Sequence, residues 1–338
     1  MISNFPVDKY QRPIKDLRIS VTDRCNFRCN YCMPAEIFGE SYKFLPKPEL
    51  LSFEEIERLA KIFAQLGVNK IRITGGEPLV RKNIESLVKA LSKIDGIADL
   101  TMTTNGFLLS KYAKSLRDSG LNRLTVSLDS LDEKVFNEMS GVKHGPQKTL
   151  DGINSAIEEG FENIKVNVVV RKGVNDHTLL DTLDYFIKKN IIVRFIEFMD
   201  VGTKNKWQMK EVVTSQEILD IVRSKYDAKP INPNYKGEVA SRYKIDDYDN
   251  EIGIISSVTN PFCGACTRAR LSTDGKLVTC LFASGGKDIR TFLRSGASDS
   301  EISDEIAKVW SQRDDRYSEL RSKGISQKEK VEMYYIGG

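Results

Sequence analysis

Histidine is scarce in this sequence. The only two histidines are His144 and His177, and neither lies inside a recognisable motif. Histidine is the side chain that most often moves protons near neutral pH. The acid and base groups of any reaction therefore stay unassigned from the sequence.

Long hydrophobic runs are also missing. The N-terminal residues MISNFPVDKYQRP have no basic start followed by an apolar core, so they do not look like a secretory signal. The longest apolar stretches are 166–170 and 191–199, and the second contains Arg194 and Glu197. Neither could span a bilayer. We therefore expect a cytoplasmic protein with no membrane partner.

Two common phosphate-binding patterns, GxxxxGK[ST] and GxGxxG, do not occur in the chain. If the substrate is a nucleotide, side chains must hold its phosphates. The formal net charge is only +4 over 338 residues. That charge does not indicate nucleic-acid binding, but it is compatible with a small anionic substrate.

All of the cysteines fall in two tight groups rather than being scattered. Neither triplet can pair off into disulfides without a remainder, and cytoplasmic thiols are kept reduced. This pattern favours ligation of a metal or a cluster. The two groups are Cys25, Cys29 and Cys32, then Cys263, Cys266 and Cys280.

Short apolar, β-branched runs alternate with amphipathic helical patterns over the first two hundred residues. The runs predict strands at 17–21, 70–74, 99–104, 123–128, 164–170 and 193–199. The amphipathic patterns predict helices after Ser52, over 83–94, 109–119, 133–138 and 150–159, and after Asn175. Ser52 and Glu55 form a capping-box pattern at the first of these helices.

Such alternation predicts an α/β fold with a parallel sheet. Six units could close into a partial (β/α)6 barrel, and an open doubly wound sheet is the alternative. In both folds the chemistry belongs at the C-terminal ends of the strands. The alternation weakens after about residue 200, so we expect a barrel over 1–200 and a smaller C-terminal domain over 201–338.

The first cysteine group, CNFRCNYC, directly follows the first predicted strand. Thiolates can hold zinc or an iron–sulfur cluster. No fourth ligand lies nearby, which favours a four-iron cluster with one open iron. CxxxCxxC with an aromatic residue, Tyr31, before the third cysteine resembles the radical S-adenosylmethionine (SAM) superfamily. The resemblance implies that the open iron binds SAM and that its reductive cleavage yields a 5′-deoxyadenosyl radical.

The second predicted strand leads into Gly75-Gly76-Glu77-Pro78. Alone, this could be an ordinary strand-ending turn. Paired glycines let a ligand approach the backbone, and a carboxylate can accept hydrogen bonds from an ammonium group. One unit after the cysteine loop, the segment resembles the superfamily's GGEP motif, which implies binding of the methionine amino group.

The second cysteine group reads CGACTRARLSTDGKLVTC over 263–280. Alone, it could be a zinc ribbon that lacks one ligand. The missing ligand again suggests a cluster with an open iron. Arg268 and Arg270 alternate, so on a strand they would share one face, where two guanidinium groups suit a polyphosphate. A solvated strand face is the alternative.

The whole chain is similar to the MoaA family of GTP 3′,8-cyclases of molybdenum cofactor biosynthesis. The similarity runs through DLRISVTDRCNFRCNYCMP, KIRITGGEPLVR, TMTTNG, VSLDS, RFIEFMDVG and CTRARLSTDGK to the terminal Gly337-Gly338. It implies a radical SAM lyase with two [4Fe-4S] clusters, the second in the C-terminal domain. The radical would remove the C3′ hydrogen of GTP, and the ribose radical would attack C8 of guanine to give 3′,8-cyclo-7,8-dihydro-GTP.

The resemblance also assigns residues by position. SAM would contact Tyr31, Gly76, Glu77, Ser127 and Met199, and GTP would contact Arg18, Lys70, Arg72, Thr103, Lys165, Arg194, Arg268 and Arg270. Catalytic roles would fall to Arg268, Arg270, Gly337 and Gly338. Basic residues among apolar strand residues favour a bound anion inside the barrel. Outward-facing positions are the alternative for them.

The C-terminal Gly337-Gly338 could be a frayed tail. In the family the tail reaches the active site, where only glycines could thread a narrow channel. We therefore predict that one bulky residue added after Gly338 abolishes turnover. The resemblance further implies a homodimer, a cellular electron donor and a downstream enzyme, MoaC. The competing functions are a radical SAM peptide-maturing enzyme, a two-cluster electron carrier and a zinc-binding structural module.

Overall fold

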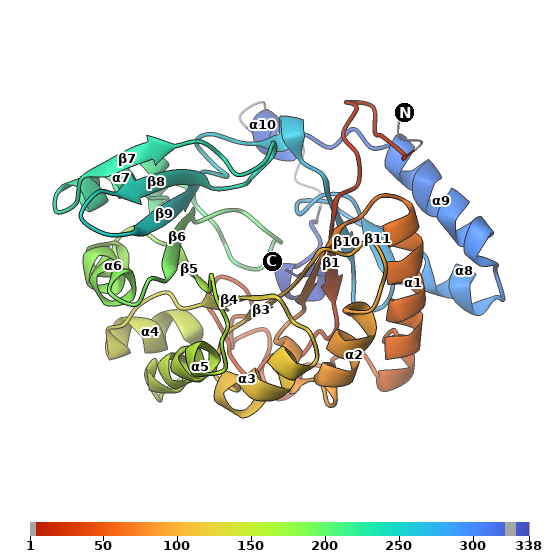
Figure 1. Ribbon diagram of the computed structural model, residues 1–338, viewed down its shortest axis with the longest axis horizontal. Coiled ribbons are helices and arrows are strands. Elements are labelled where there is room, and N and C mark those ends of the chain that lie inside the picture. The colour runs from red at the N-terminus through yellow and green to blue at the C-terminus, as the bar shows by residue number, and fades with distance from the viewer. Residues whose placement is uncertain (1–4, 322–328, 338) are drawn as a thin grey trace.

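The computed structural model describes residues 5–321 and 329–337. It contains one sheet of twelve strands in the order β12-β11-β10-β1-β2-β3-β4-β5-β6-β9-β8-β7. The sheet is curved, and the C-terminal end of the chain lies on its inner side (Figure 1).

The six predicted strands are confirmed, with ends that differ by one or two residues. They are β1 (Asp16–Ser20), β2 (Lys70–Thr74), β3 (Asp99–Thr104), β4 (Arg123–Ser127), β5 (Lys165–Val170) and β6 (Ile192–Glu197). Adjacent strands of this set pair in parallel. Because β6 ends at Glu197, Met199 lies in the loop that follows rather than on the strand.

The predicted helices are also present and lie outside the curved sheet (Figure 1). They are α1 (Phe53–Gln65), α2 (Ile84–Leu91), α3 (Leu109–Asp118), α4 (Glu133–Ser140), α5 (Gln147–Glu158) and α6 (Leu179–Ile187). The capping box at α1 forms as expected, with the Ser52 side chain accepting from the backbone of Glu55. Helices on the outside only are typical of a barrel wall, whereas a doubly wound sheet is covered on both faces.

Strand alternation separates the core from the barrel interior. Leu17 and Ile19 of β1 are fully buried in the core, whereas Asp16 and Arg18 line the cavity on the other face. The same alternation turns Arg72 of β2 toward the cavity. The inner face is therefore polar although most of the strand residues are apolar.

The C-terminal third extends both edges of the sheet. β7 (Ala228–Ile231), β8 (Ser241–Ile245) and β9 (Asn250–Ile255) continue from β6. β10 (Arg268–Leu271), β11 (Lys276–Val278) and β12 (Lys287–Asp288) continue from β1. The helices of this part are α7 (Ser215–Arg223), α8 (Arg290–Arg294), α9 (Asp299–Ser311), α10 (Tyr317–Leu320) and α11 (Met333–Ile336).

This continuity affects the domain boundary expected near residue 200. The sheet crosses that point without a break, because β6 pairs with β9 and β1 pairs with β10. The division into 1–200 and 201–338 stays a prediction. Within the described residues, no helix is both long and apolar enough to cross a membrane.

Candidate active site

A deep cavity on the inner face of the sheet brings most of the predicted site residues together. Both cysteine groups line it, although they lie more than two hundred residues apart in sequence. The predicted SAM and GTP residues that also line it are Arg18, Tyr31, Lys70, Arg72, Gly76, Glu77, Thr103, Ser127, Arg194, Met199, Arg268 and Arg270. The outward-facing alternative for these basic strand residues is therefore wrong.

The first cysteine group forms a compact turn after β1. The backbone N–H groups of Cys32 and Met33 donate to the carbonyl of Cys29 at 3.0 and 2.8 Å. The N–H of Phe27 points at the Cys25 sulfur, 3.4 Å away. All three cysteines are free thiols that face one cavity; burial raises the pKa of each thiol, and the Phe27 N–H partly opposes that rise at Cys25. The donor set therefore fits an iron–sulfur cluster.

The thiols are not gathered tightly enough for a single ion. Among residues 5–321 and 329–337, no three His, Cys, Asp or Glu side chains come together as the ligands of one metal ion would. The ligands of a four-iron cluster bind different irons, so they stand apart by the width of the cluster.

The two glycines after β2 pack directly against the cysteine turn. A Cβ atom on Gly76 would lie 2.3 Å from the carbonyl oxygen of Arg24, and one on Gly75 would lie 2.6 Å from that of Thr22. Gly75 also has a φ of 149°. The close approach that requires glycine here is thus to the cysteine loop itself, a packing role that the sequence did not reveal.

Glu77 is buried at the cavity wall. Its carboxylate accepts from the Thr104 hydroxyl at 2.7 Å and from the N–H groups of Asn105 at 2.7 Å and Leu79 at 3.0 Å. Burial raises the pKa of Glu77 to about 7, although these hydrogen bonds oppose the rise. A carboxylate has about four acceptor positions. Three are occupied, so one remains for a donor such as an ammonium group.

Asp129 is a residue of this region that sequence reasoning missed. The Tyr31 hydroxyl donates to Asp129 at 2.7 Å, and the N–H of Val169 donates to it at 2.9 Å. Burial raises the pKa of Asp129 to about 6. Because it follows β4 after Leu128, its position at a strand end was the only signal that could have identified it.

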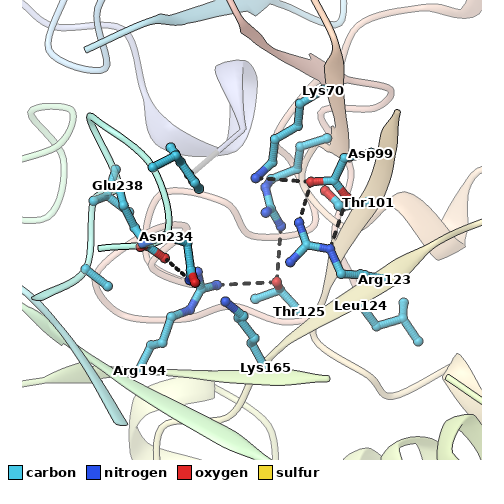
Figure 2. A pocket seen from close by; sticks show the side chains of 14 residues that line it. Lys70, Asp99, Thr101, Arg123, Leu124, Thr125, Lys165, Arg194, Asn234 and Glu238 are labelled. Carbon is cyan, nitrogen blue, oxygen red and sulfur yellow. Dashed lines mark hydrogen bonds and ion pairs between the residues drawn. The ribbon is translucent and has the colours of Figure 1, made fainter. Parts of the chain in front are cut away.

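Basic side chains converge at the N-terminal ends of the strands (Figure 2). Lys165 lines this second pocket rather than the deep cavity, and the two share Lys70, Arg72 and Arg194. Burial, together with Arg194, lowers the pKa of Lys165 to about 8, and burial with Arg72 lowers that of Arg194 to about 9. Buried cations that depress each other's pKa in this way suit an anionic ligand.

Arg123 and Asp99 belong to the same pocket and were missed. Arg123 Nε donates to Asp99 at 3.0 Å, and Lys70 Nζ lies 3.4 Å from the same carboxylate (Figure 2). Both residues open their strands, where charges usually meet solvent. Only the approach of the 234–240 loop, which includes Tyr235, encloses them in a pocket.

The second cysteine group meets the arginines of β10. Arg268 donates from Nε and Nη2 to the Cys266 sulfur at 3.2 and 3.1 Å. Burial alone would raise the pKa of Cys266, but Arg268 and Arg313 lower it to about 6. A thiolate beside guanidinium groups is a suitable cluster ligand. Arg270 and Arg268 line the cavity together, as the strand alternation predicted.

The tail reaches into the same cavity. Arg270 Nη1 donates to the carbonyl of Gly337. Gly337 has a φ of 71°, and a Cβ atom there would come within 1.6 Å of the Thr74 hydroxyl. A larger residue is therefore not accommodated. Gly338 lies outside the described residues, so its predicted role is not addressed by the structure.

This combination of a partial barrel, a CxxxCxxC turn after its first strand and a GGEP segment after its second defines a radical SAM protein. Residues 19–186 match the Radical SAM superfamily, and residues 191–319 match Molybdenum Cofactor Synthesis C. The crystal structure of Streptococcus suis SuiB bound to S-adenosylmethionine has a TM-score of 0.61 at 18% identity, over 92% of this chain and 68% of that one. At this low identity, the SuiB structure supports only the similarity of fold.

Closer relatives give the family. The GTP 3′,8-cyclases of Staphylococcus haemolyticus and Staphylococcus epidermidis are 52% identical to this chain over 98% of both chains. That of Staphylococcus aureus is 49% identical over the same shares. The chain belongs to the GTP 3′,8-cyclase family.

Proposed function

We propose that the protein converts GTP to 3′,8-cyclo-7,8-dihydro-GTP by radical SAM chemistry, an early step of molybdenum cofactor biosynthesis. The observation that carries this function is one cavity lined by two cysteine triads and connected to a cationic pocket. Full-length identity of 52% to GTP 3′,8-cyclases supports the substrate. A four-iron cluster held by Cys25, Cys29 and Cys32 would supply the electron for the reductive cleavage of SAM.

The residues near the first triad bind and orient SAM. Glu77 has one free acceptor position for the methionine ammonium group, and Gly76 leaves its backbone accessible beside it. Tyr31, fixed by Asp129, together with Ser127 and Met199, forms the rest of the wall.

The residues on the other side of the cavity hold GTP. Lys70, Arg72, Lys165 and Arg194 neutralise the triphosphate, because they line a pocket with few carboxylates. Arg72 is itself held by Thr103 and Thr125 at 3.0 and 3.1 Å, which fixes its orientation. A further set lies between this pocket and the second triad and contacts the nucleoside or its developing product: Arg18, Arg268, Arg270 and the Gly337 tail.

Three partners follow from the family rather than from contacts in this chain. We infer an external one-electron donor, because the reductive cleavage of SAM consumes an electron that neither SAM nor GTP supplies. A homodimer and delivery of the unstable product to MoaC are the other two. Light scattering of the purified protein tests the dimer.

The activity is tested by an anaerobic assay of the reconstituted, reduced protein with SAM and GTP. Mass spectrometry should detect 5′-deoxyadenosine in a GTP-dependent yield, with a cyclised isomer of GTP. ATP in place of GTP is the control and should give neither. Deoxyadenosine with unchanged GTP would reject the substrate but keep the radical mechanism, and the peptide-maturing function would then be tested next.

A further inference from the structure

A buried cluster of charges lies behind the second cysteine triad, and of its three members only Arg313 also lines the cavity. Asp8 and Arg313 are almost fully buried, and so is Arg12. Asp8 Oδ2 accepts from Arg12 Nε at 2.6 Å and from Arg313 Nη1 at 2.9 Å. Two segments more than three hundred residues apart thus meet at one carboxylate.

Both guanidinium groups also donate to the backbone that carries the cysteines. Arg12 Nη1 donates to the carbonyl of Cys263 at 2.6 Å. Arg313 donates to the carbonyl of Cys266 at 2.9 Å and, through Nε, to that of Thr279 at 3.1 Å. Thr279 directly precedes Cys280. Every cysteine of the second triad is therefore held at or next to its own peptide by one of these two arginines.

Further contacts fix the arginines in single orientations. The Trp310 indole N–H donates to the carbonyl of Arg12 at 2.8 Å, and the Arg313 guanidinium lies 4.5 Å from the centre of the Trp310 ring. The Asp8 carboxylate also accepts from the N–H groups of Tyr10 and Arg12 at 2.9 Å. This arrangement is rigid, because each charged group has partners on several sides.

We propose that Asp8, Arg12 and Arg313 form a clamp that positions the second cysteine triad to accept its iron–sulfur cluster. The proposal rests on the proposed function only in that it takes the second triad to hold a cluster. The first triad is held in another way: Arg28 Nη1 donates to the carbonyl of Cys25 at 2.8 Å, and backbone hydrogen bonds and the glycines after β2 hold the rest of its turn. The clamp residues are positioning residues. Asp8 and Arg12 do not line the cavity, and Arg313, which does, acts on the cysteines through their backbone carbonyls.

The physical reason is the cost of an unpaired buried charge. Asp8→Asn would leave the buried Arg12 without the carboxylate it pairs with, and Arg313→Gln would leave Asp8 with Arg12 alone; losing such a partner is strongly destabilising. The freed carbonyls would lose charged donors, so the cysteine-bearing peptides could move. Outer partners of this kind commonly change the affinity of a metal site by one or two orders of magnitude.

The test compares iron and sulfide content and the electron paramagnetic resonance (EPR) signals of the reduced full-length protein after reconstitution. We expect Arg313→Gln and Asp8→Asn to lower the iron content from about eight to about four per chain. The lost EPR signal should be that of the second cluster, while the SAM-induced change of the first remains. Arg242→Gln is the matched control, because it breaks a part-buried ion pair with Glu251 far from both triads. It should leave both clusters loaded.

Two further measurements keep the outcome clear. If Arg313→Gln fails to fold by circular dichroism, Arg313→Lys decides, since lysine keeps the charge but cannot reach Cys266 and Thr279 with a planar fork. It should still alter the EPR signal of the second cluster. Full iron content with unchanged second-cluster signals in the folded variants would overturn the clamp. Neither readout uses GTP turnover, so failure of the proposed function would be seen separately.

Discussion

At the scale of single residues, the barrel interior is unusual because so many cations are buried together. Burial lowers the pKa of Arg72, Lys165 and Arg194, and the charge of Arg123 lowers it further in all three. Asp99 compensates part of this charge by pairing with Lys70 and Arg123. An incoming triphosphate would provide the remaining negative charge, which explains why the pocket tolerates the repulsion.

The amine of Lys165 predicts that kcat/KM for GTP depends on pH. Its pKa of about 8 means that the amine is charged below pH 8 and neutral above it. Binding energy from this charge is therefore present at pH 7 and lost as the pH rises through 8. A charged contact of ~1.4 kcal/mol is worth about tenfold, and the charged fraction of Lys165 falls from about nine tenths at pH 7 to about one tenth at pH 9, so we expect kcat/KM for GTP to fall about fivefold over this range.

The control is Lys165→Arg, which stays charged in this range and should remove the part of the fall centred near pH 8 that Lys165 causes. Lys165→Gln should already show the low value at pH 7. A wild-type profile that does not change between pH 7 and 9 would contradict the assignment of Lys165 to the GTP site.

Gly337 gives a steric prediction. Alanine there would place its Cβ atom 1.6 Å from the Thr74 hydroxyl at a φ of 71°, so the tail cannot keep its path. We expect Gly337→Ala to lower turnover at least tenfold with no change in iron content. Replacing Thr74 with alanine in addition should restore part of the activity. Full activity of the single variant would mean that the tail is not needed in this position.

At the scale of elements, the contact between the end of β2 and the cysteine turn is the most demanding one. The glycines after β2 meet the carbonyls of Thr22 and Arg24, which are backbone atoms that cannot move aside cheaply. The N–H groups of Gly76 and Glu77 donate to the same carbonyls at 2.7 and 2.8 Å. The second strand thus shapes the loop that follows the first.

Gly76→Ala tests this contact. A Cβ atom 2.3 Å from the Arg24 carbonyl should displace the turn that carries Cys25, Cys29 and Cys32. We expect the first cluster to be lost and the second retained, so that iron content falls to about half. Gly285→Ala is the control, since nothing lies within 4 Å of a Cβ atom there. Normal loading of the first cluster in Gly76→Ala would disprove the packing argument.

At the scale of the whole molecule, the C-terminal segment closes the cavity by returning to the barrel. Asp200, in the loop after β6, binds Lys330 and the Tyr317 hydroxyl, each at 2.6 Å. Tyr334 of α11 packs on Phe38 and hydrogen-bonds Tyr42 at 2.8 Å. The tail thus depends on contacts with two loops that leave different strands.

Asp200→Asn should loosen this docking. A carboxylate shared by several donors and largely shielded from solvent contributes more than an exposed pair. We expect a fall of about tenfold in kcat, normal iron content, and faster hydrogen exchange over 329–337. Arg58→Gln, which breaks a more exposed pair with Asp299, is the control and should change little. Unchanged exchange in Asp200→Asn would argue against the docking role.

Much of this protein was determined by the sequence itself. The spacing of apolar residues along the chain predicted the six strands and their helices. A helix that buries one face needs apolar residues at a helical spacing, and strands appear as short apolar runs. The spacing of the cysteines and the GGEP segment indicated the chemistry, and the alternation of Arg268 and Arg270 placed both side chains on one face.

Only the tertiary structure decided which residues far apart in the sequence come into contact. Pairing of β1 with β10 brings the second triad opposite the first, and no local pattern encodes that pairing. The same applies to Asp8, which meets Arg313 only when the two ends of the chain come together. Asp99, Arg123 and Asp129 looked like ordinary strand-end charges until loops from elsewhere enclosed them. The local spacing of apolar residues indicates which face of a helix or strand is buried. Contacts between distant segments depend instead on how the whole sheet curves and how its strands pair.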